Sequence, residues 1–410
     1  MCLKKNIFLP LILCFSLNTS FAQTSDSNQT LEAATQGDAL AQYNLGVMYD
    51  KGQGVAQSYA KAFEWYSKAA NQGSAPAQYN LGFMYYSGQG VAQSYVKAFE
   101  WYSKAAVQGY ASAQYNLGVM YDKGQGVAQS YAKAFEWYSK AANQGSAPAQ
   151  YNLGFMYYSG QGVAQSYVKA FEWYSKAAVQ GYASAQYNLG LMYDDGRGVE
   201  KSYAKAFEWY SKAANQGLAP AQYNLGVMYA NGRGVEKSAV KVFEWWSKAA
   251  TQGDASAQQN LANMYQYGNG VEKNYSKAIE WYTKAANQGL AEAQFSIGNN
   301  YYYGNGVEKN YSKAIEWYTK AANQGYASAQ NNLAAMYTNG LGVDKNSFLA
   351  NEWYLKAADQ GNTNAQFNIG QNYLYGNNGL PKNRTQALNW LRKASNNGHA
   401  QAKLMLAGLQ

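Results

Sequence analysis

The chain has 410 residues, with 33 Lys and Arg, 24 Asp and Glu, and a formal net charge of +9. The positive charge is spread along the chain without a basic run, so we expect no nucleic-acid partner. The single histidine, His399, excludes a Ser-His-Asp triad and histidine-based metal sites, and we interpret it as a solvated loop residue.

Residues 1–22 are predicted to be a signal peptide. Lys4 and Lys5 precede an apolar run over residues 7–17, and residues 20–22 fit a small-x-small cleavage site. The run is too short to span a bilayer, so a retained anchor is the weaker alternative. We therefore expect an exported protein, most simply periplasmic, with secretion as the alternative and no stable membrane insertion after cleavage.

Both cysteines, Cys2 and Cys14, lie inside this segment. Cys14 suggests a lipoprotein, but Leu13 precedes it where a small residue is expected. The mature chain then contains no cysteine, which excludes disulfides and thiolate metal sites, and burial must supply its stability.

The rest of the chain repeats itself every 36 residues. The phrase AQYNLG begins at 41, 77, 113, 149, 185 and 221, and variants begin at 257, 293, 329 and 365. Residues 41–112 and 113–184 are identical, which indicates duplication of a two-repeat block. We assign 23–30 to a linker, 31–40 to an N-terminal half-repeat cap, 41–401 to ten tandem units and 402–410 to a C-terminal capping helix.

Each unit contains two helical patterns. In the first, Ala41, Leu45, Met48 and Tyr49 fall on one helical face. Position 46 and its equivalents are only Gly or Ala, which predicts close approach of a neighbouring helix. Residues at equivalent positions of the ten repeats are called a column, and each column is named by its residue number in the first repeat.

The second pattern places Trp65, Tyr66 and small alanines at helical spacing, and predicts that Trp65 and its equivalents are structural. Glu64 and Lys68 stand at i, i+4 in the favourable order. Gly73 predicts a left-handed C-terminal cap. The two glycines at 52 and 54 follow a helix rather than a strand, so we interpret them as a turn and not a phosphate-binding loop.

Ser58 to Lys61 spell S-x-x-K, the nucleophile signature of penicillin-binding proteins and serine β-lactamases. Column 58 is serine in six units and asparagine in four, Asn274 being the first of these. Both residue types cap helices, but asparagine does not replace a serine nucleophile, and no K-T-G element is present. The helix-cap interpretation is therefore preferred.

The repeated pattern A-x-x-x-L-G-x-x-Y-x-x-G-x-G-V-x-x-[SN]-x-x-K-A-x-x-W-Y-x-K-A-A-x-x-G resembles that of the Sel-one-like repeat (SLR) family, relatives of the tetratricopeptide repeats. The resemblance spans about 41–401 and implies an all-α fold, a right-handed α/α solenoid whose first helices line a concave surface. It also implies an adaptor or scaffold function. Column 58 departs mildly from the family, which often has aspartate there, and that departure changes only the cap.

A partner is expected on the face of the first helix opposite Ala41 and Leu45, where columns 43, 47 and 50 vary more than the core. The alternative is that these side chains pack against the adjoining repeat. The candidate partner-binding residues are Tyr43, Val47, Tyr79, Phe83, Tyr86, Tyr115, Val119, Tyr151, Phe155, Tyr158, Tyr187, Leu191, Tyr223 and Val227. Asn44 and its equivalents either hold a peptide backbone or, as we prefer, bridge adjacent repeats.

These observations favour an exported, non-enzymatic scaffold, a monomer that binds a protein or peptide and needs no cofactor or metal. Its role could be in an envelope complex, in neutralising a toxin or in contacting a host protein. A cell-wall-directed enzyme using S-x-x-K and a purely mechanical spacer are the alternatives. The first four repeats carry GVAQS and the fifth to eighth carry GVEKS or GVEKN, so the second half of the array is more charged. One partner could bind along both halves, or each half could bind a different partner.

Overall fold

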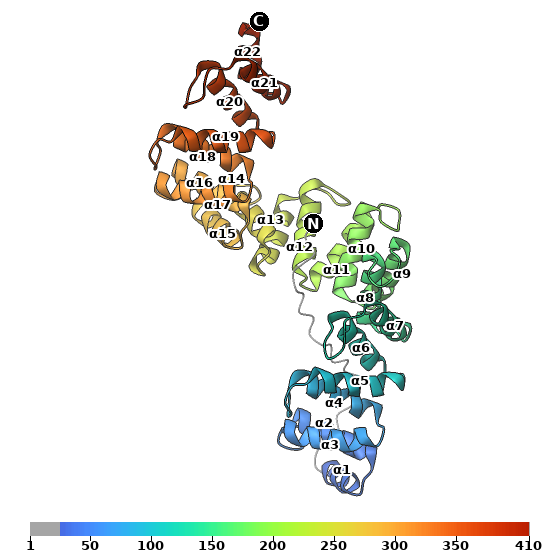
Figure 1. Cartoon of the computed structure of the whole chain (residues 1–410). Coiled ribbons are helices and arrows are strands. Elements are labelled where there is room, and N and C mark those ends of the chain that lie inside the picture. The colour runs from blue at the N-terminus through green and yellow to red at the C-terminus, as the bar shows by residue number, and fades with distance from the viewer. Residues whose placement is uncertain (1–24, 410) are drawn as a thin grey trace. The chain divides into compact units, whose positions relative to one another are not determined.

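The structure, a computed structural model, describes residues 25–409. The expected signal peptide, 1–22, lies outside the described residues. The described part consists of 22 helices and contains no strand (Figure 1). It forms two compact units, the first ending at Ser202 and the second beginning at Tyr203, and each is described by itself.

The first unit contains ten helices that alternate between the first and second helix of successive repeats. They are α1 (Ser25–Thr35), α2 (Ala39–Lys51), α3 (Tyr59–Asn71), α4 (Ala75–Ser87), α5 (Tyr95–Val107), α6 (Ala111–Lys123), α7 (Tyr131–Asn143), α8 (Ala147–Ser159), α9 (Tyr167–Val179) and α10 (Ala183–Asp195). Even-numbered helices are the first helices of their repeats. Each helix packs against its neighbours in the chain.

The second unit continues the same alternation. Its helices are α11 (Tyr203–Asn215), α12 (Ala219–Asn231), α13 (Ala239–Thr251), α14 (Ala255–Tyr267), α15 (Tyr275–Asn287), α16 (Ala291–Tyr303), α17 (Tyr311–Asn323), α18 (Ala327–Asn339), α19 (Ser347–Asp359), α20 (Thr363–Tyr375), α21 (Arg384–Asn396) and α22 (Ala400–Leu409). Sequential packing of helix pairs makes the fold an α/α solenoid, as predicted.

The ends of the helices follow the predicted capping residues. Ser58 Oγ accepts a hydrogen bond from the Lys61 N–H at 3.4 Å, and Asn274 Oδ1 accepts the equivalent bond from Lys277 at 2.9 Å. Gly73 adopts φ 93° just beyond α3, where a residue with a side chain would be strained. Serine and asparagine in column 58 thus both cap the second helix of the repeat, and the cap interpretation is confirmed.

The core of most repeats centres on the tyrosine of column 66, which lies against the small residue of column 46. In the second repeat, a Cβ placed on Gly82 would lie 2.8 Å from the Tyr102 ring, and that ring is fully buried. Close approach of the paired helices therefore explains why column 46 admits only Gly or Ala, as predicted.

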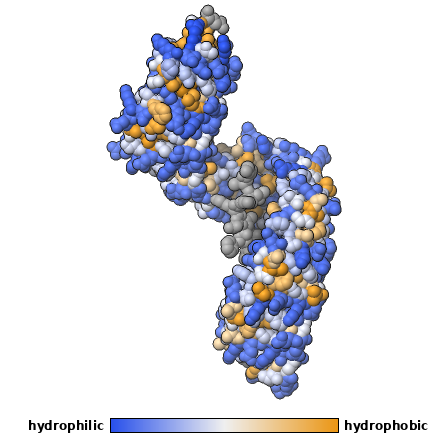
Figure 2. All heavy atoms as spheres, viewed as in Figure 1, coloured by the Kyte–Doolittle hydropathy of each residue, from blue (hydrophilic) through white to orange (hydrophobic). Residues whose placement is uncertain are grey.

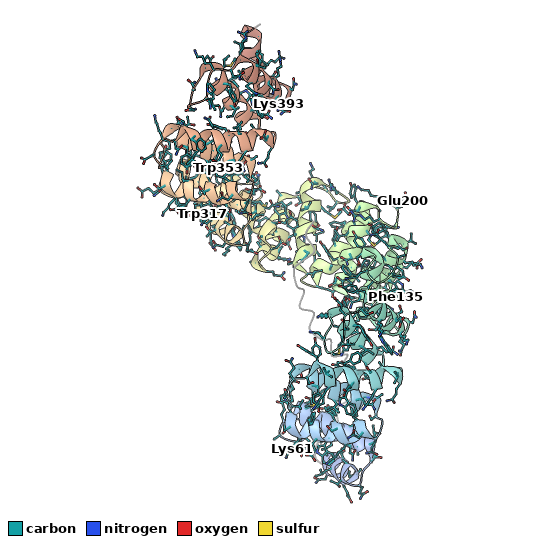
Figure 3. The ribbon with its side chains drawn as sticks, in the orientation of Figure 1. Lys61, Phe135, Glu200, Trp317, Trp353 and Lys393 are labelled. Carbon is teal, nitrogen blue, oxygen red and sulfur yellow. The ribbon has the colours of Figure 1, made fainter. Side chains whose placement is uncertain are left out.

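The tryptophans of the second helices fill the seam with the preceding repeat. Trp317 and Trp353 (Figure 3) pack against alanine-rich core clusters formed with the preceding second helix. Lys320 Nζ lies 4.0 Å from the centre of the Trp317 ring, and this stacking recurs along the array. The structural interpretation of these tryptophans is confirmed, and it also accounts for the even spread of basic charge.

A ladder of glutamines, which the sequence analysis did not single out, joins successive repeats. Gln78 Nε2 donates to the Ala70 carbonyl at 3.1 Å, and Gln78 Oε1 accepts from Gln108 Nε2 at 2.7 Å. The same Gln–Gln bond recurs in both units, and asparagine replaces the donor in the last repeat. A polar residue that is fixed in all ten copies was the signal for this ladder.

The two ends differ in detail from the expected pattern. Helix α1 begins at Ser25, inside the stretch assigned to a linker, and Ala34 near its end is buried in the first repeat. His399 is not simply solvated, because Nδ1 accepts the Ala402 N–H at 3.2 Å and its ring stacks 4.2 Å from Phe367. Thus His399 caps α22, as asparagine or serine caps other helices.

Candidate protein-binding face

The candidate face consists of columns 43, 47 and 50 of the first helices. Column 43 faces the seam between repeats: the rings of Tyr43 and Tyr66 lie 5.9 Å apart, and the Tyr43 hydroxyl interacts with Asn80 of the next repeat. The structure places Tyr43, Tyr115, Tyr151, Tyr187 and Tyr223 as half-buried and Tyr79 as buried. These tyrosines keep only part of their surface available to a partner.

The asparagines of column 44 bridge adjacent repeats, which was the preferred interpretation. Asn152 interacts with Tyr115, and Asn188 interacts with Tyr151, in each case across one repeat. Burial, opposed by the Asn152 contact, raises the pKa of Tyr115 to about 12. These asparagine amides therefore contact the neighbouring repeat rather than the backbone of a bound peptide.

Column 47 differs because it remains partly exposed while its side chain changes. Val47, Phe83, Leu191 and Val227 are half-buried, and Phe155 is 36% exposed. Val119 is the exception, with 9% exposure. On the face drawn in Figure 2, hydrophobic residues form separate patches surrounded by hydrophilic ones, the kind of surface on which apolar anchors bind.

Column 50, at the last turn of the first helix, reaches toward the next repeat. The Tyr86 hydroxyl donates to Gln125 Oε1 at 3.0 Å. The Tyr158 hydroxyl accepts a hydrogen bond from the Arg197 guanidinium, which also lies 5.9 Å from the centres of the Tyr158 and Tyr167 rings. Tyrosine in this column therefore contacts the loop residue 39 positions further along the chain.

A cavity lies beside Asp50. It lies between the first two repeats and has a volume of about 340 Å³. Burial raises the pKa of the Asp50 carboxyl, and the Lys51 charge opposes that shift. The cavity is lined by Asp50, Lys51, Gln57, Tyr59, Tyr66, Tyr79, Asn80, Phe83, Met84 and Gln89. It combines aromatic walls with a half-buried carboxyl group.

The second unit presents different chemistry on column 47. Asn263 and Asn299 accept hydrogen bonds from the buried hydroxyls of Tyr282 and Tyr318, the latter at 2.7 Å. In the first unit the same column carries only Val, Phe or Leu. The difference between the two halves seen in the sequence therefore also exists at the level of contacts.

The S-x-x-K motif has no catalytic arrangement in the first repeat. Ser58 Oγ accepts a backbone N–H, and Lys61 Nζ lies 5.0 Å from the centre of the Tyr49 ring rather than beside the hydroxyl. A serine nucleophile needs an adjacent base, and here the lysine stacks on an aromatic ring instead. Within residues 25–409 no cluster of three or more His, Cys, Asp or Glu side chains is placed to hold a metal.

The Sel1 repeat family matches the chain in ten consecutive segments, 39–74, 75–110, 111–146, 147–182, 183–218, 219–254, 255–290, 291–326, 327–362 and 363–399. The chain belongs to this family, as the repeat pattern predicted. Proteins of the Sel1 repeat family are generally non-enzymatic scaffolds for protein interaction.

Two solved structures are similar over most of the chain. The protein c5321, a protective antigen of uropathogenic Escherichia coli strains with an SLR fold, is 41% identical, with a TM-score of 0.87 over 93% of this chain and 82% of that one. A Sel1 repeat protein from Oxalobacter formigenes is 34% identical, with a TM-score of 0.58 over 76% of this chain and 90% of that one. No curated protein sequence matches the chain.

None of the described helices combines the length and apolar character that crossing a membrane requires.

Proposed function

We propose that this chain is an exported, non-enzymatic adaptor that binds a protein or peptide along the first helices of its repeats. Column 47 is the observation that supports this most directly. It stays half-exposed in nine of the ten repeats while its residue changes from Val to Phe, Leu, Ala, Asn or Gln. A residue that serves only packing is expected to stay buried and constant, as column 66 does in most repeats.

The family relationship supports the same proposal at a coarser level, since Sel1 repeat proteins generally bind other proteins. The relative c5321 is described as a protective antigen, which is consistent with an exported protein that meets other molecules outside the cytoplasm. The expected signal peptide supports export independently. We expect the adaptor to act as a monomer.

The test is a crosslinking capture from the cell envelope fraction, with the mature chain as bait. The variant replaces Phe83, Phe155 and Leu191 of column 47 by serine. These side chains are better suited to the test than the tyrosines of column 43, because Tyr79 is only 8% exposed and its replacement would disturb the core. We expect the triple variant to lose the captured protein.

A matched control keeps the change in surface polarity but moves it to the second helices. Val96 and Val168 are each 57% exposed on α5 and α9, and their replacement by serine should leave capture intact. Both variants must show the helical circular dichroism of the parent. Equal capture by the parent and the column 47 variant would place the interface elsewhere, and no capture by any form would favour a spacer.

A further inference from the structure

The cavity between the first two repeats lies where aspartate, and not tyrosine, occupies column 50. Tyr86 and Tyr158 extend to the loop of the following repeat and bond to Gln125 and Arg197. Asp50 is shorter, so the space between it and the corresponding loop residue, Gln89, is part of the cavity.

In the second to fourth repeats the exposure of column 47 varies with the residue at column 50 of the preceding repeat, whereas Leu191, after Tyr158, is half-buried. Val119, in the repeat after Tyr86, is 9% exposed, whereas Phe155, in the repeat after Asp122, is 36% exposed. Phe83, after Asp50, is half-buried and lines the cavity. Asp50 and Asp122 are therefore each followed, in the next repeat, by a partly exposed phenylalanine.

The chain itself shows which chemical group fits this position. In the first unit, Arg197 places its guanidinium 5.9 Å from the rings of Tyr158 and Tyr167, and pairs with Asp195 at 3.4 Å. Tyr59 is the equivalent of Tyr167, is 38% exposed and lines the cavity. A cation at this position therefore has aromatic rings as neighbours, and at the cavity Asp50 stands where Tyr158 stands beside Arg197.

Among the residues that line the cavity, Lys51 is the one cation, and it directly follows Asp50 in the sequence. Asp50 and Asp122 form none of the salt bridges found among the described residues. Gln89 and its copy Gln161 stand where Arg197 stands in the fifth repeat. Burial raises the pKa of both carboxyl groups. The adjacent Lys51 and Lys123 oppose that shift, and at Asp122 a hydrogen bond with Tyr138 also opposes it. A half-buried carboxylate gains most from a partner that brings a positive charge.

We propose that this cavity, and the identical set of residues between the third and fourth repeats, each receive a lysine or arginine side chain of a bound protein segment. The carboxylate of Asp50 or Asp122 pairs with the basic group, and the rings of Tyr59, Phe83 and their copies contact its aliphatic stem and charge. This inference rests on the proposed adaptor function. It identifies the partner as a segment with two basic side chains, because residues 41–112 recur unchanged at 113–184.

The duplication supplies a test with an internal control. Met84 lines the first cavity, and its copy Met156 packs beside Tyr138 and Tyr131 of the second set. The mature chain, labelled with carbon-13 at the methionine methyl groups, is titrated with a short blocked alanine peptide that carries one central lysine. The matched peptide carries norleucine, which keeps the stem and removes the charge.

We expect the lysine peptide to shift the Met84 and Met156 methyl signals and the norleucine peptide to bind at least about tenfold more weakly, as loss of a charge-assisted contact predicts. Asp50→Asn should reduce the Met84 response by a similar factor and leave the Met156 response unchanged, and Asp122→Asn should do the reverse. Met192 serves as a reference signal distant in sequence from both sites.

Three results would overturn the inference: equal shifts with both peptides, an unchanged Met84 response in Asp50→Asn, or no shift of either methyl signal at saturating peptide. None of them would affect the adaptor proposal, because the titration does not use the natural partner. Conversely, failure of capture from the envelope fraction would leave the titration result standing.

Discussion

Individual glycines and tyrosines determine how closely the two helices of a repeat approach. Gly82 packs on the buried Tyr102 ring, and Gly226 packs in the same way on Trp246 in the second unit. Column 46 holds buried alanine at Ala262 and Ala334, so a single methyl group is tolerated in some repeats. At a glycine of column 46, an added methyl group therefore lowers the free energy of unfolding through overpacking. The higher helix propensity of alanine offsets part of that loss.

Gly82→Ala is expected to lower the free energy of unfolding by about 1–2 kcal/mol. Overpacking costs roughly 1–3 kcal/mol and the gain in helix propensity returns at most about 1 kcal/mol. Urea unfolding followed by circular dichroism measures the effect.

Gly408→Ala is the matched control for this glycine, since a Cβ at Gly408 would meet no atom within 4 Å. It should be neutral or slightly stabilising because only the propensity changes. A Gly82→Ala protein as stable as this control would show that the ring moves away at no cost.

At the scale of helices, repeats are joined by polar contacts as well as by apolar packing. Gln78 is 5% exposed and uses both ends of its amide, toward the Ala70 carbonyl at the end of α3 and toward Gln108 at the end of α5. One side chain of α4 therefore ties together the ends of two second helices. Removal of the Gln78 side chain leaves the Ala70 carbonyl and the Gln108 amide without these hydrogen bonds.

Gln78→Ala should cost about 1–3 kcal/mol, the penalty for leaving a buried polar group unsatisfied. The loss should be local: amide hydrogen exchange should accelerate in the last turn of α3 and the first turns of α4, while α8 and α9 keep the protection of the parent. Gln53→Ala, which changes an exposed loop glutamine, is the control and should alter neither region.

Over the whole molecule, stability depends on tyrosines that must stay neutral. The chain has 40 tyrosines, and the rings of columns 43 and 66 contact each other in tilted pairs in several repeats. Burial raises the pKa of Tyr115 to about 12 and raises that of Tyr138 well above its ordinary value. Ionisation of these phenols is therefore coupled to unfolding in both units, since Tyr223 shows the same direction of shift.

We expect the chain to unfold cooperatively in alkali. An unfolded tyrosine titrates near its ordinary value of about 10, so above that pH the unfolded state binds fewer protons than the folded state. The free energy of unfolding consequently falls as pH rises from about 10 toward the raised folded pKa values. The contribution is fully present below the unfolded value. Tyrosinate absorbance and circular dichroism recorded together should change in one transition, whereas early titration without loss of helix would contradict this prediction.

The repeat length, the helix pairs, their caps and the core columns could all be predicted from the sequence. Each of these depends on residues a few positions apart, such as Ser58 with the N–H of Lys61, or on the φ preference of a single residue such as Gly73. Ten copies in register repeat each local preference, so chance matches are excluded.

Only the tertiary structure decided which apolar columns remain accessible. Tyr86 bonds to Gln125, 39 residues further along the chain, whereas a cavity lies beside Asp50 and Phe83. Periodicity places columns 43, 47 and 50 on one helical face, but it does not tell whether the next repeat covers them. That outcome depends on the length and polarity of side chains that meet across the seam, and these meet only when the helices are packed.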